Sequence, residues 1–284
     1  MNYTKLQTEP AYKKLLALQG IIKEMGSVLI AFSGGVDSTF LLNVAQNVLG
    51  NRVIAATAQS ATYPENEYLD AKRIAKKLHV KHIVFNSDEM SCSDFVANPP
   101  NRCYYCKKEL FTKLQEIARK SGIKHIVDGT NFSDKSDYRP GRAALRELGI
   151  RSPLVEAHLT KDDIRALSRK MHLSTAEKPS FACLASRLPY GEKITREKLD
   201  RVNKAETLLR EIGFKEVRVR DYGTLARIEI GTKDKLSRIL ETPIRNRLIR
   251  RLKKLGYIYI TLDLEGYRTG SMNEILSLER DNLG

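Results

Sequence analysis

The 284-residue sequence predicts an α/β protein: a Rossmann-like, doubly wound parallel sheet followed by a smaller α+β C-terminal domain. Three observations predict this class. Short apolar runs alternate with helical patterns of about 10–15 residues, which is typical of βαβ units with helices on both faces of a parallel sheet. The first apolar run ends at a glycine pair that opens a helix. After Pro179 the alternation gives way to a helix followed by paired strands.

The first domain is expected to contain four strands and the helices between them. The strands are the apolar runs at 27–32, 52–58, 81–85 and 125–127. The helices are expected at Ser38–Leu49, from Pro64 with a buried stripe of Leu69, Ile74, Ala75 and Leu78, and at Lys107–Lys120. In such sheets, ligands bind beyond the carboxyl ends of the strands. The segments Ser33–Ser38 and Asp128–Asn131, which follow the first and the fourth strand, are therefore the expected binding site.

The second part of the chain shows a different pattern, and we place a domain boundary near Arg187, giving domains of residues 1–186 and 187–284. A helix is expected at Ile194–Ile212, strands at 216–220 and 225–230, a helix at Pro243–Leu255, and a β-rich run at 257–264. The Pro243–Leu255 helix carries apolar residues on one face and basic residues elsewhere. We interpret its basic side as a solvated surface rather than an RNA-binding surface.

Composition bounds the class of protein and its partners. The net charge is +15, from 49 basic and 34 acidic residues, which suits an anionic partner such as a nucleotide, an acidic small molecule or RNA, although solvated helix faces would also account for it. No stretch approaches the roughly 20 apolar residues of a membrane span. The first residues lack the apolar core of a signal peptide. We therefore expect a cytoplasmic protein without a membrane partner. A homo-oligomer is a further expectation.

The segment Ser33-Gly34-Gly35-Val36-Asp37-Ser38 has the composition of a phosphate-binding loop. Glycines let the backbone approach phosphate oxygens, and the N–H groups of a following helix supply positive potential. Ser33 and Ser38 add hydroxyl donors. Asp37 is unexpected beside phosphates unless it orients a divalent cation, so we expect Mg²⁺. The motifs of P-loop NTPases and of dinucleotide-binding folds are absent.

The stretch A-F-S-G-G-V-D-S resembles the signature of the PP-loop, or N-type ATP pyrophosphatase, superfamily. Members of that superfamily cleave ATP between the α and β phosphates and adenylate a carbonyl or carboxylate oxygen, and a nucleophile then displaces AMP. The resemblance implies that Ser33, Gly34, Gly35, Asp37 and Ser38 hold the pyrophosphate. The later D-G-T-N resembles the second nucleotide-side loop of the superfamily, which adds Gly129 and Asn131 to the expected ATP-binding residues.

The four cysteines do not form a disulfide scaffold, because they are too few for a chain of this length. Cys103 and Cys106 form a C-x-x-C just before an expected helix, and Cys183 lies far along the chain. A four-cysteine zinc site would need a second C-x-x-C. Three thiolates suit a [4Fe-4S] cluster with one iron left open, while a redox pair is the alternative for the C-x-x-C. Cys92 is left over, either as a fourth ligand or as an incidental cysteine.

Three further segments carry a narrower resemblance. D-Y-R-P-G at 137–141, K-P-S-F-A-C-L-A-S-R-L-P-Y-G at 178–191 and V-R-V-R followed by A-R-I-E at 217–229 are together similar to the LarE family, and the match runs from about Ser27 to Asn273. The resemblance implies an ATP-dependent sulfur transferase. It would adenylate a carboxylate of pyridinium-3,5-biscarboxylic acid mononucleotide and convert it to a thiocarboxylate, in biosynthesis of the nickel-pincer nucleotide cofactor.

One branch of the LarE family sacrifices the sulfur of a single cysteine, and another is thought to hold a [4Fe-4S] cluster that passes on a bound sulfide. The presence of Cys103, Cys106 and Cys183 makes this chain similar to the cluster branch, with the three thiols as cluster ligands and Cys183 and Asp37 as catalytic residues. The single-donor alternative would make Cys183 the nucleophile. The donor of the sulfide is unknown. An iron–sulfur-dependent tRNA thiolase and a non-catalytic nucleotide-binding regulator are the other hypotheses.

The alternation in Glu216–Arg220 places Arg218 and Arg220 on one face of a strand, with Val217 and Val219 facing the core. If Asp221–Thr224 is the whole turn, Arg220 pairs with Leu225 and Arg218 with Arg227. Because like charges opposite each other are destabilising, we expect an anion there and infer a site for the phosphate of the substrate; a solvated face is the alternative. The LarE resemblance supports Arg218 and Arg220 as phosphate ligands and adds Ser186, Arg187, Glu206 and Glu229 as substrate-site residues.

Overall fold

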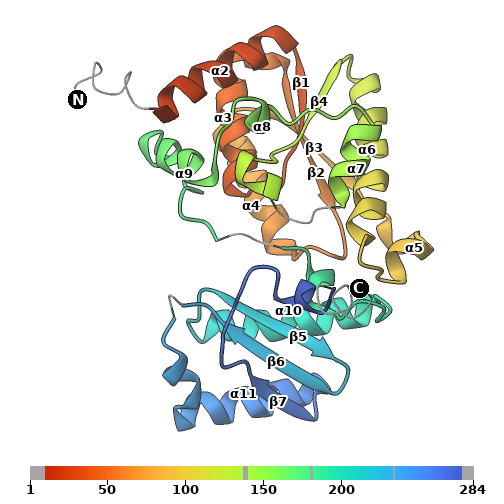
Figure 1. The fold of residues 1–284 in the computed structure, drawn as a ribbon, viewed down its shortest axis with the longest axis vertical. Helices are drawn as coiled ribbons and strands as arrows, with labels where there is room; N and C mark the ends of the chain where they lie inside the picture. The colour runs from red at the N-terminus through yellow and green to blue at the C-terminus, as the bar shows by residue number, and fades with distance from the viewer. Residues whose placement is uncertain (1–9, 137–139, 180–181, 233, 277–284) are drawn as a thin grey trace, which may run out of the picture. The chain divides into compact units, whose positions relative to one another are not determined.

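The computed structural model describes residues 10–136, 140–179, 182–232 and 234–276. The described residues pack as two compact units, which divide the chain into Met1–Glu89 with Cys103–Phe181 and Met90–Arg102 with Ala182–Gly284 (Figure 1). The second unit thus includes a short segment from the first half of the chain, which the sequence pattern did not indicate. The domain boundary near Arg187 stays a prediction.

The first unit is an α/β fold around a parallel sheet of four strands in the order β3-β2-β1-β4. Its strands are β1 (Val28–Ala31), β2 (Val53–Gln59), β3 (Lys81–Asn86) and β4 (His125–Val127). Its helices are α2 (Pro10–Met25), α3 (Val36–Leu49), α4 (Glu65–Lys77), α6 (Arg102–Lys120), α7 (Gly141–Glu147), α8 (Pro153–Glu156) and α9 (Lys161–Lys170). The predicted fold class, a Rossmann-like parallel sheet, is confirmed.

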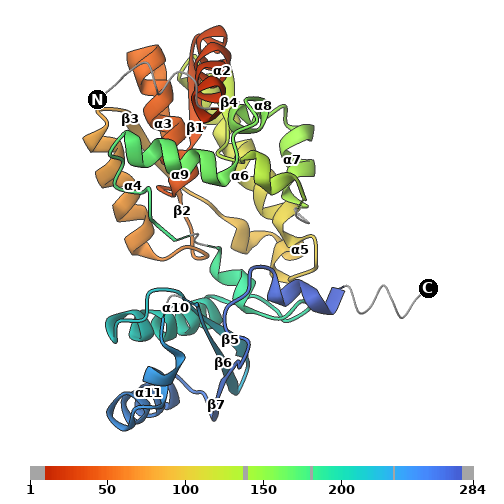
Figure 2. The ribbon, with the colours of Figure 1, turned by 60° about the vertical axis from the view of Figure 1, so that its left-hand side comes forward.

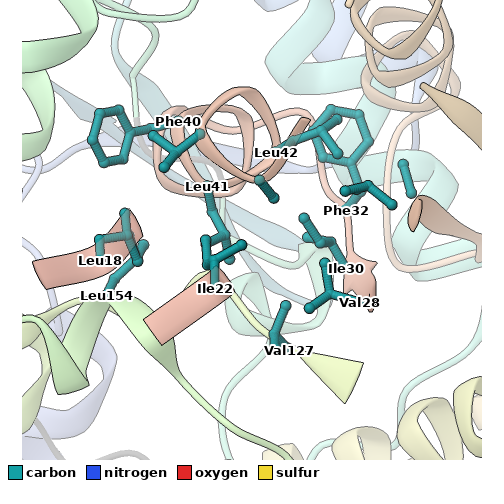
Figure 3. Packing of buried hydrophobic residues seen from close by; sticks show 14 of the residues in the cluster. Leu18, Ile22, Val28, Ile30, Phe32, Phe40, Leu41, Leu42, Val127 and Leu154 are labelled. Carbon is teal, nitrogen blue, oxygen red and sulfur yellow. The ribbon is translucent and has the colours of Figure 1, made fainter. Parts of the chain in front are cut away.

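Alternating residues of the central strand β1 face two separate cores, because side chains of a strand point to opposite faces. Val28 and Ile30 pack with apolar residues of α2, α3 and α4, and Leu29 packs with residues of α6 and α7. Figure 3 shows Ile22 of α2 next to Leu41 of α3, with Val28 and Ile30 of β1 to the right of them. Both faces of the sheet are therefore covered by helices, as a doubly wound sheet requires.

The strand order creates a switch point between β1 and β4. The chain moves from β1 to β2 and β3 on one side and then returns to place β4 on the other side of β1. Ligands of open α/β sheets bind at such a point, beyond the carboxyl ends of the strands. The loops that follow β1 and β4 therefore open side by side.

Two sequence-based expectations for this unit are wrong. Leu69 is 46% exposed, whereas Ala75 of the predicted stripe is buried as expected. Helix α4 also buries Ala71, because this small residue allows the helix to approach the loop after β1. Helix α6 begins at Arg102 rather than Lys107, so that Cys103 lies inside its first turn. The prolines at 99 and 100 precede this helix and nothing between Arg102 and Lys107 interrupts it.

The second unit is an α+β fold. It contains α5 (Ser93–Val96), α10 (Arg196–Glu211), β5 (Val217–Tyr222), β6 (Leu225–Ile230), α11 (Thr242–Lys254) and β7 (Tyr259–Leu262), with 3-10 helices that include Leu184–Arg187 and Ser271–Asn273. The sheet has the order β5-β6-β7, with an antiparallel and a parallel pair (Figure 2). Apolar residues of α10, α11 and the sheet form its core. No helix in the described ranges is long and apolar enough to span a membrane.

Candidate functional site

The loop between β1 and α3 is shaped by its two glycines. Gly34 has a φ of +69°, which favours glycine, and a Cβ added to it would lie 3.1 Å from the Cα of Ala71 on α4. Gly35 precedes α3 and provides no side chain to cap it. A helix N-terminus presents its first-turn N–H groups to an anion. The local sequence thus builds a backbone cradle for phosphate, backed closely by α4.

The loop after β4 contacts this cradle directly. A Cβ added to Gly129 would lie 3.1 Å from the backbone nitrogen of Ser38, so a larger residue would push the two loops apart. Asp128, at the end of β4, accepts hydrogen bonds from the hydroxyls of Thr130 and, at 2.6 Å, Ser152. Asn131 is buried, and its backbone N–H donates to Asp134. The structure therefore brings together the two loops that the sequence placed at separate strand ends.

These loops border a cavity of about 550 Å³. Of the predicted ATP-binding residues, Ser33, Gly35, Asp37, Ser38 and Gly129 line it. Gly34 and Asn131 are not among the lining residues, since Gly34 packs against α4 and Asn131 is only 2% exposed. Apolar side chains of β2 and α6, including Ala56, Leu110 and Leu114, form another part of the wall. A cavity with a polar, glycine-rich end and an apolar part suits a nucleotide.

Asp37 has a cationic partner that the sequence did not indicate. The Nζ of Lys161, at the N-terminus of α9, lies 2.5 Å from Asp37 Oδ2. Burial raises the pKa of Asp37 above its ordinary value, although Lys161 opposes this shift. The other oxygen, Oδ1, is buried without a hydrogen-bond partner among the described residues. A buried carboxylate oxygen without a hydrogen-bond partner is suited to coordinate a metal ion, so the residues present fit the expected Mg²⁺.

Sequence reasoning missed further residues of this cavity. Lys107 of α6 lines it, as do Gln59 and Ser60 at the carboxyl end of β2. The signal for the β2 residues was available, because the carboxyl end of every parallel strand meets the same edge of the sheet. Lys107 and Lys161 carried no comparable signal, since a lone lysine on a helix is usually solvated.

The cysteines lie in different units. Cys103 and Cys106 are one turn apart on α6, where residues three apart share a face. Cys103 is exposed and Cys106 half-buried, while Cys183 is half-buried just before Leu184–Arg187 in the second unit. None of the four cysteines forms a disulfide. In the described residues, no group of three or more His, Cys, Asp or Glu side chains is gathered closely enough to hold a metal ion.

One glycine of the D-Y-R-P-G segment lies against the cysteine turn. A Cβ added to Gly141 would lie 3.1 Å from the carbonyl oxygen of Cys103 and 2.9 Å from Cγ of Lys107. Any larger residue would displace this turn of α6 or the Lys107 side chain. Residues 137–139 of the same segment, and Ser180 and Phe181 before Cys183, lie outside the described residues.

The predicted substrate residues of the second unit form one buried cluster. Arg187, fully buried, donates to Glu206 through Nε at 2.7 Å and Nη2 at 3.1 Å. Its Nη1 also donates to the carbonyl oxygen of Cys183 at 3.1 Å and the hydroxyl of Ser186 at 2.9 Å. Glu206 accepts further from the Val219 N–H at 3.2 Å. Arg187 therefore ties the Cys183 segment to α10 and β5.

A second buried pair lies beside the first. Arg220 donates to both oxygens of Glu229, at 2.9 and 2.6 Å, and to the carbonyl oxygen of Ser186 at 3.0 Å. Arg218 stacks over the ring of Tyr267, and burial, followed by the charge of Arg187, lowers the pKa of Arg218. Among the five side chains Arg187, Glu206, Arg218, Arg220 and Glu229, three cations meet two anions. This excess of positive charge suits a phosphate.

The strand register differs from the one predicted. Arg218 pairs with Glu229 and Arg220 with Arg227, because the turn consists of Gly223 and Thr224 alone and the strands continue to Tyr222 and Leu225. Gly223 has a φ of +70°, as a tight two-residue turn requires. Glu229 contacts both facing arginines, at 2.6 and 3.1 Å, so a protein carboxylate separates these like charges. The face is also buried rather than solvated, with Arg218 and Arg220 no more than 5% exposed.

Comparisons with known proteins agree with this architecture. The asparagine synthase family model matches residues 22–100, which include the phosphate loop. A pyridinium-3,5-bisthiocarboxylic acid mononucleotide synthase of Lactiplantibacillus plantarum is 38% identical over 93% of this chain and 95% of its own length. An uncharacterized protein of Synechocystis is 42% identical over 93% of this chain and 98% of its own. A GMP synthase of Aeropyrum pernix is 27% identical over 68% of this chain and 41% of its own length.

The first two similarities extend through both units, from the phosphate loop to the arginine cluster, whereas the GMP synthase similarity covers a smaller share of either protein. The part of this chain that aligns with the first two relatives includes the parallel sheet, the glycine-rich loop at its switch point and the adjoining cavity. The chain belongs to the LarE-type family of ATP-dependent sulfur transferases, within the PP-loop superfamily.

Proposed function

We propose that this enzyme adenylates a carboxylate of pyridinium-3,5-biscarboxylic acid mononucleotide and converts it to a thiocarboxylate. The observation that carries the proposal is the 38% identity, over 93% of the chain, to a synthase named for the bisthiocarboxylic acid product. The cavity at the phosphate loop supports the ATP half of the reaction. The buried arginine cluster supports a phosphorylated acceptor.

The reaction has two bond exchanges. A carboxylate oxygen of the substrate attacks the α-phosphorus, the bond to the β-phosphate oxygen breaks, and pyrophosphate leaves. A sulfur nucleophile then attacks the acyl carbon, and AMP leaves with the carboxylate oxygen. Ser33, Gly35 and Ser38 bind the pyrophosphate half of ATP, and Asp37 holds Mg²⁺, which neutralises phosphate charge when bound. Positioning and charge neutralisation supply most of the rate in such transfers.

The substrate phosphate is assigned to the second unit. Arg218 and Arg220 are its proposed ligands, with Ser186, Arg187, Glu206 and Glu229 arranging them. Because Arg187 donates to the carbonyl oxygen of Cys183, a phosphate bound here lies on the same framework as that thiol. This arrangement supports Cys183 as the residue nearest the acyl carbon when sulfur is transferred.

Release of pyrophosphate distinguishes the candidate substrates. With Mg²⁺ and ATP, we expect pyrophosphate and AMP to form with the pyridinium dicarboxylate mononucleotide and not with bulk tRNA. Pyrophosphate is measured by a coupled phosphate assay, and the thiocarboxylate by mass spectrometry. Activity with tRNA alone would favour a tRNA thiolase and reject the proposal. No pyrophosphate with either substrate would favour a non-catalytic nucleotide-binding protein.

The sulfur route is the finer part of the proposal. Cys103 and Cys106, one turn apart on α6, would hold two irons of a [4Fe-4S] cluster, and Cys183 a third. Such a cluster supplies an open iron that can carry an exogenous sulfide. The donor of that sulfide is not assigned. The alternative uses the sulfur of Cys183 itself and leaves dehydroalanine. We also expect a cytoplasmic homo-oligomer.

Anaerobic purification separates the two routes. The cluster route predicts a brown protein that absorbs at about 400 nm and holds about four irons per chain. Cys103→Ala, Cys106→Ala and Cys183→Ala should each lower the iron content strongly, whereas Cys92→Ala, the matched control, should leave it unchanged. Iron absent after anaerobic reconstitution, together with loss of the mass of H₂S from Cys183 after one turnover, would establish the single-cysteine route instead.

A further inference from the structure

Lys178 makes three contacts to the phosphate loop and to α4. Its Nζ lies 2.8 Å from Glu67 Oε2 and 3.3 Å from Asp70 Oδ2. The same atom donates to the carbonyl oxygen of Gly34 at 3.4 Å. The side chain is 18% exposed. Sequence patterns give Lys178 no role beyond being the first residue of the segment 178–191 around Cys183.

The contact with Gly34 bears on the orientation of one peptide group. In a trans peptide, the carbonyl of Gly34 and the N–H of Gly35 point in opposite directions. An ammonium on the carbonyl side therefore favours the orientation in which the Gly35 N–H points away from Lys178. Gly35 lines the cavity, whereas Lys178 is not among its lining residues. The charge of Lys178 thus acts on the Gly34 carbonyl without entering the cavity.

Glycine flexibility makes such a support necessary. Gly34 and Gly35 have no side chains to limit rotation of the peptide between them, and a flip of that peptide would turn a carbonyl oxygen toward the phosphates. Ala71 of α4 packs against Gly34, and Glu67 and Asp70 of the same helix hold the Lys178 ammonium. Two ion pairs on a largely buried lysine limit its alternative positions.

We propose that Lys178 is a positioning residue that orients the Gly34–Gly35 peptide for binding the pyrophosphate half of ATP. The inference rests on the proposed use of ATP by this loop and adds to it a residue outside the cavity. Lys178 acts through the backbone, so its effect follows the β and γ phosphates and not the adenosine part of the nucleotide.

The test compares ligands that do and do not occupy the loop. Lys178→Met keeps the aliphatic chain and removes the charge. We expect isothermal titration with Mg²⁺ present to show affinity for inorganic pyrophosphate and for ATP reduced about tenfold, the size of one charge-assisted hydrogen bond, while affinity for AMP stays within about twofold. Lys178→Arg, which keeps the charge, should recover part of the loss. A general disturbance of the fold would reduce AMP binding as well.

Arg73→Met is the matched control. Arg73 also pairs with Asp70, but its side chain is 79% exposed and no contact with Gly34 is present in the described structure. Arg73→Met should leave the affinities for pyrophosphate, ATP and AMP unchanged. Equal losses for AMP and pyrophosphate, or none for pyrophosphate, would overturn the inference. If Lys178→Met does not fold, the same comparison is made with Lys178→Gln, which also removes the charge, and unchanged pyrophosphate binding together with an unchanged KM for ATP would overturn the inference.

The two proposals fail in different ways. If the wild-type protein binds neither ATP nor pyrophosphate, the proposed function and this inference both fall. If the wild-type protein binds both ligands and Lys178→Met binds pyrophosphate equally well, the proposed function stands and only the positioning role of Lys178 is rejected.

Discussion

Replacing Asp37 with Asn is expected to reduce pyrophosphate formation by at least about 10²–10³-fold, the effect of removing one group that stabilises transition-state charge. The carboxylate lines the cavity beside the phosphate loop and keeps one oxygen open for a cation. An amide at this position binds Mg²⁺ much more weakly. The rate is measured under saturating substrate, with Mg²⁺ varied, and full activity in the variant would show that Asp37 holds no catalytic metal.

The same substitution is expected to stabilise the protein near neutral pH. Burial raises the pKa of Asp37 above its value in an unfolded chain, so ionising this carboxyl costs folding free energy, and the cost is present above the folded-state pKa and vanishes as the pH falls below the unfolded value. A neutral Asn avoids it. Thermal unfolding at pH 7 should therefore give a higher midpoint for Asp37→Asn than for the wild type, a gain that shrinks toward acid pH.

Asp162→Asn is the control for this result. Asp162 is exposed and lies next to Lys161 in the first turn of α9, and its substitution removes the same charge as Asp37→Asn. Its loss should leave the rate unchanged and lower the unfolding midpoint slightly, because a carboxylate favours a helix N-terminus. In the metal-free wild-type protein, Asp37 should take up its proton at a pH above the ordinary aspartate value, so Mg²⁺ affinity should begin to fall there on acidification. Lys161→Gln should move this loss of Mg²⁺ affinity to a higher pH, since the charge of Lys161 lowers the pKa of Asp37.

Replacing Glu206 with Gln is expected to destabilise the second unit by about 3–5 kcal/mol, the cost of leaving one partner of a buried pair uncompensated. Glu206 and Arg187 are both fully buried, and the carboxylate also accepts from Arg210 at 2.6 Å. Urea unfolding followed by circular dichroism measures the change. Arg210→Ala is the matched control, because the Arg210 side chain is 30% exposed and its loss should cost no more than about 1 kcal/mol. Equal costs for the two variants would contradict the prediction.

The pH dependence of this effect has a defined sign. Burial by itself would raise the pKa of Glu206, but Arg187, Arg210 and Arg218 outweigh it and hold the pKa below the ordinary value of 4.5. A lowered folded-state pKa gives stability that is present above the unfolded value and is lost as the pH falls through the folded one. The difference in stability between wild type and Glu206→Gln should therefore narrow on acidification below about pH 4.5.

Much of the first unit could be predicted because its signals are local. The apolar run of β1, the glycine pair and the helical pattern of α3 adjoin each other, and so their order along the chain sets the geometry of the phosphate loop. The strand-end rule then placed Gly129 at the same edge of the sheet. What sequence patterns did not reveal was how far α6 extends toward Asn101, because Cys103 and its neighbours are neutral in helix preference.

In the second unit, sequence alternation identified the right residues but not their partners. Val217 and Val219 face the core as predicted, and Arg218 and Arg220 share the other face. The register depended on the length of one turn, and a change in turn length changes every pair. The anion between the facing arginines Arg220 and Arg227 is Glu229 of the same chain.

The sequence by itself determined the strand–loop–helix units, the glycine cradle and the family, because these depend on neighbouring residues and on motifs in a fixed order. Tertiary structure alone decided which charges meet. Lys161 reaches Asp37 across 124 residues, and Lys178 reaches Gly34 across 144. Such pairs are set by how the sheet closes and which helices cover it, and no local pattern records them, because many lysines could satisfy one carboxylate or carbonyl until packing places a single one within reach.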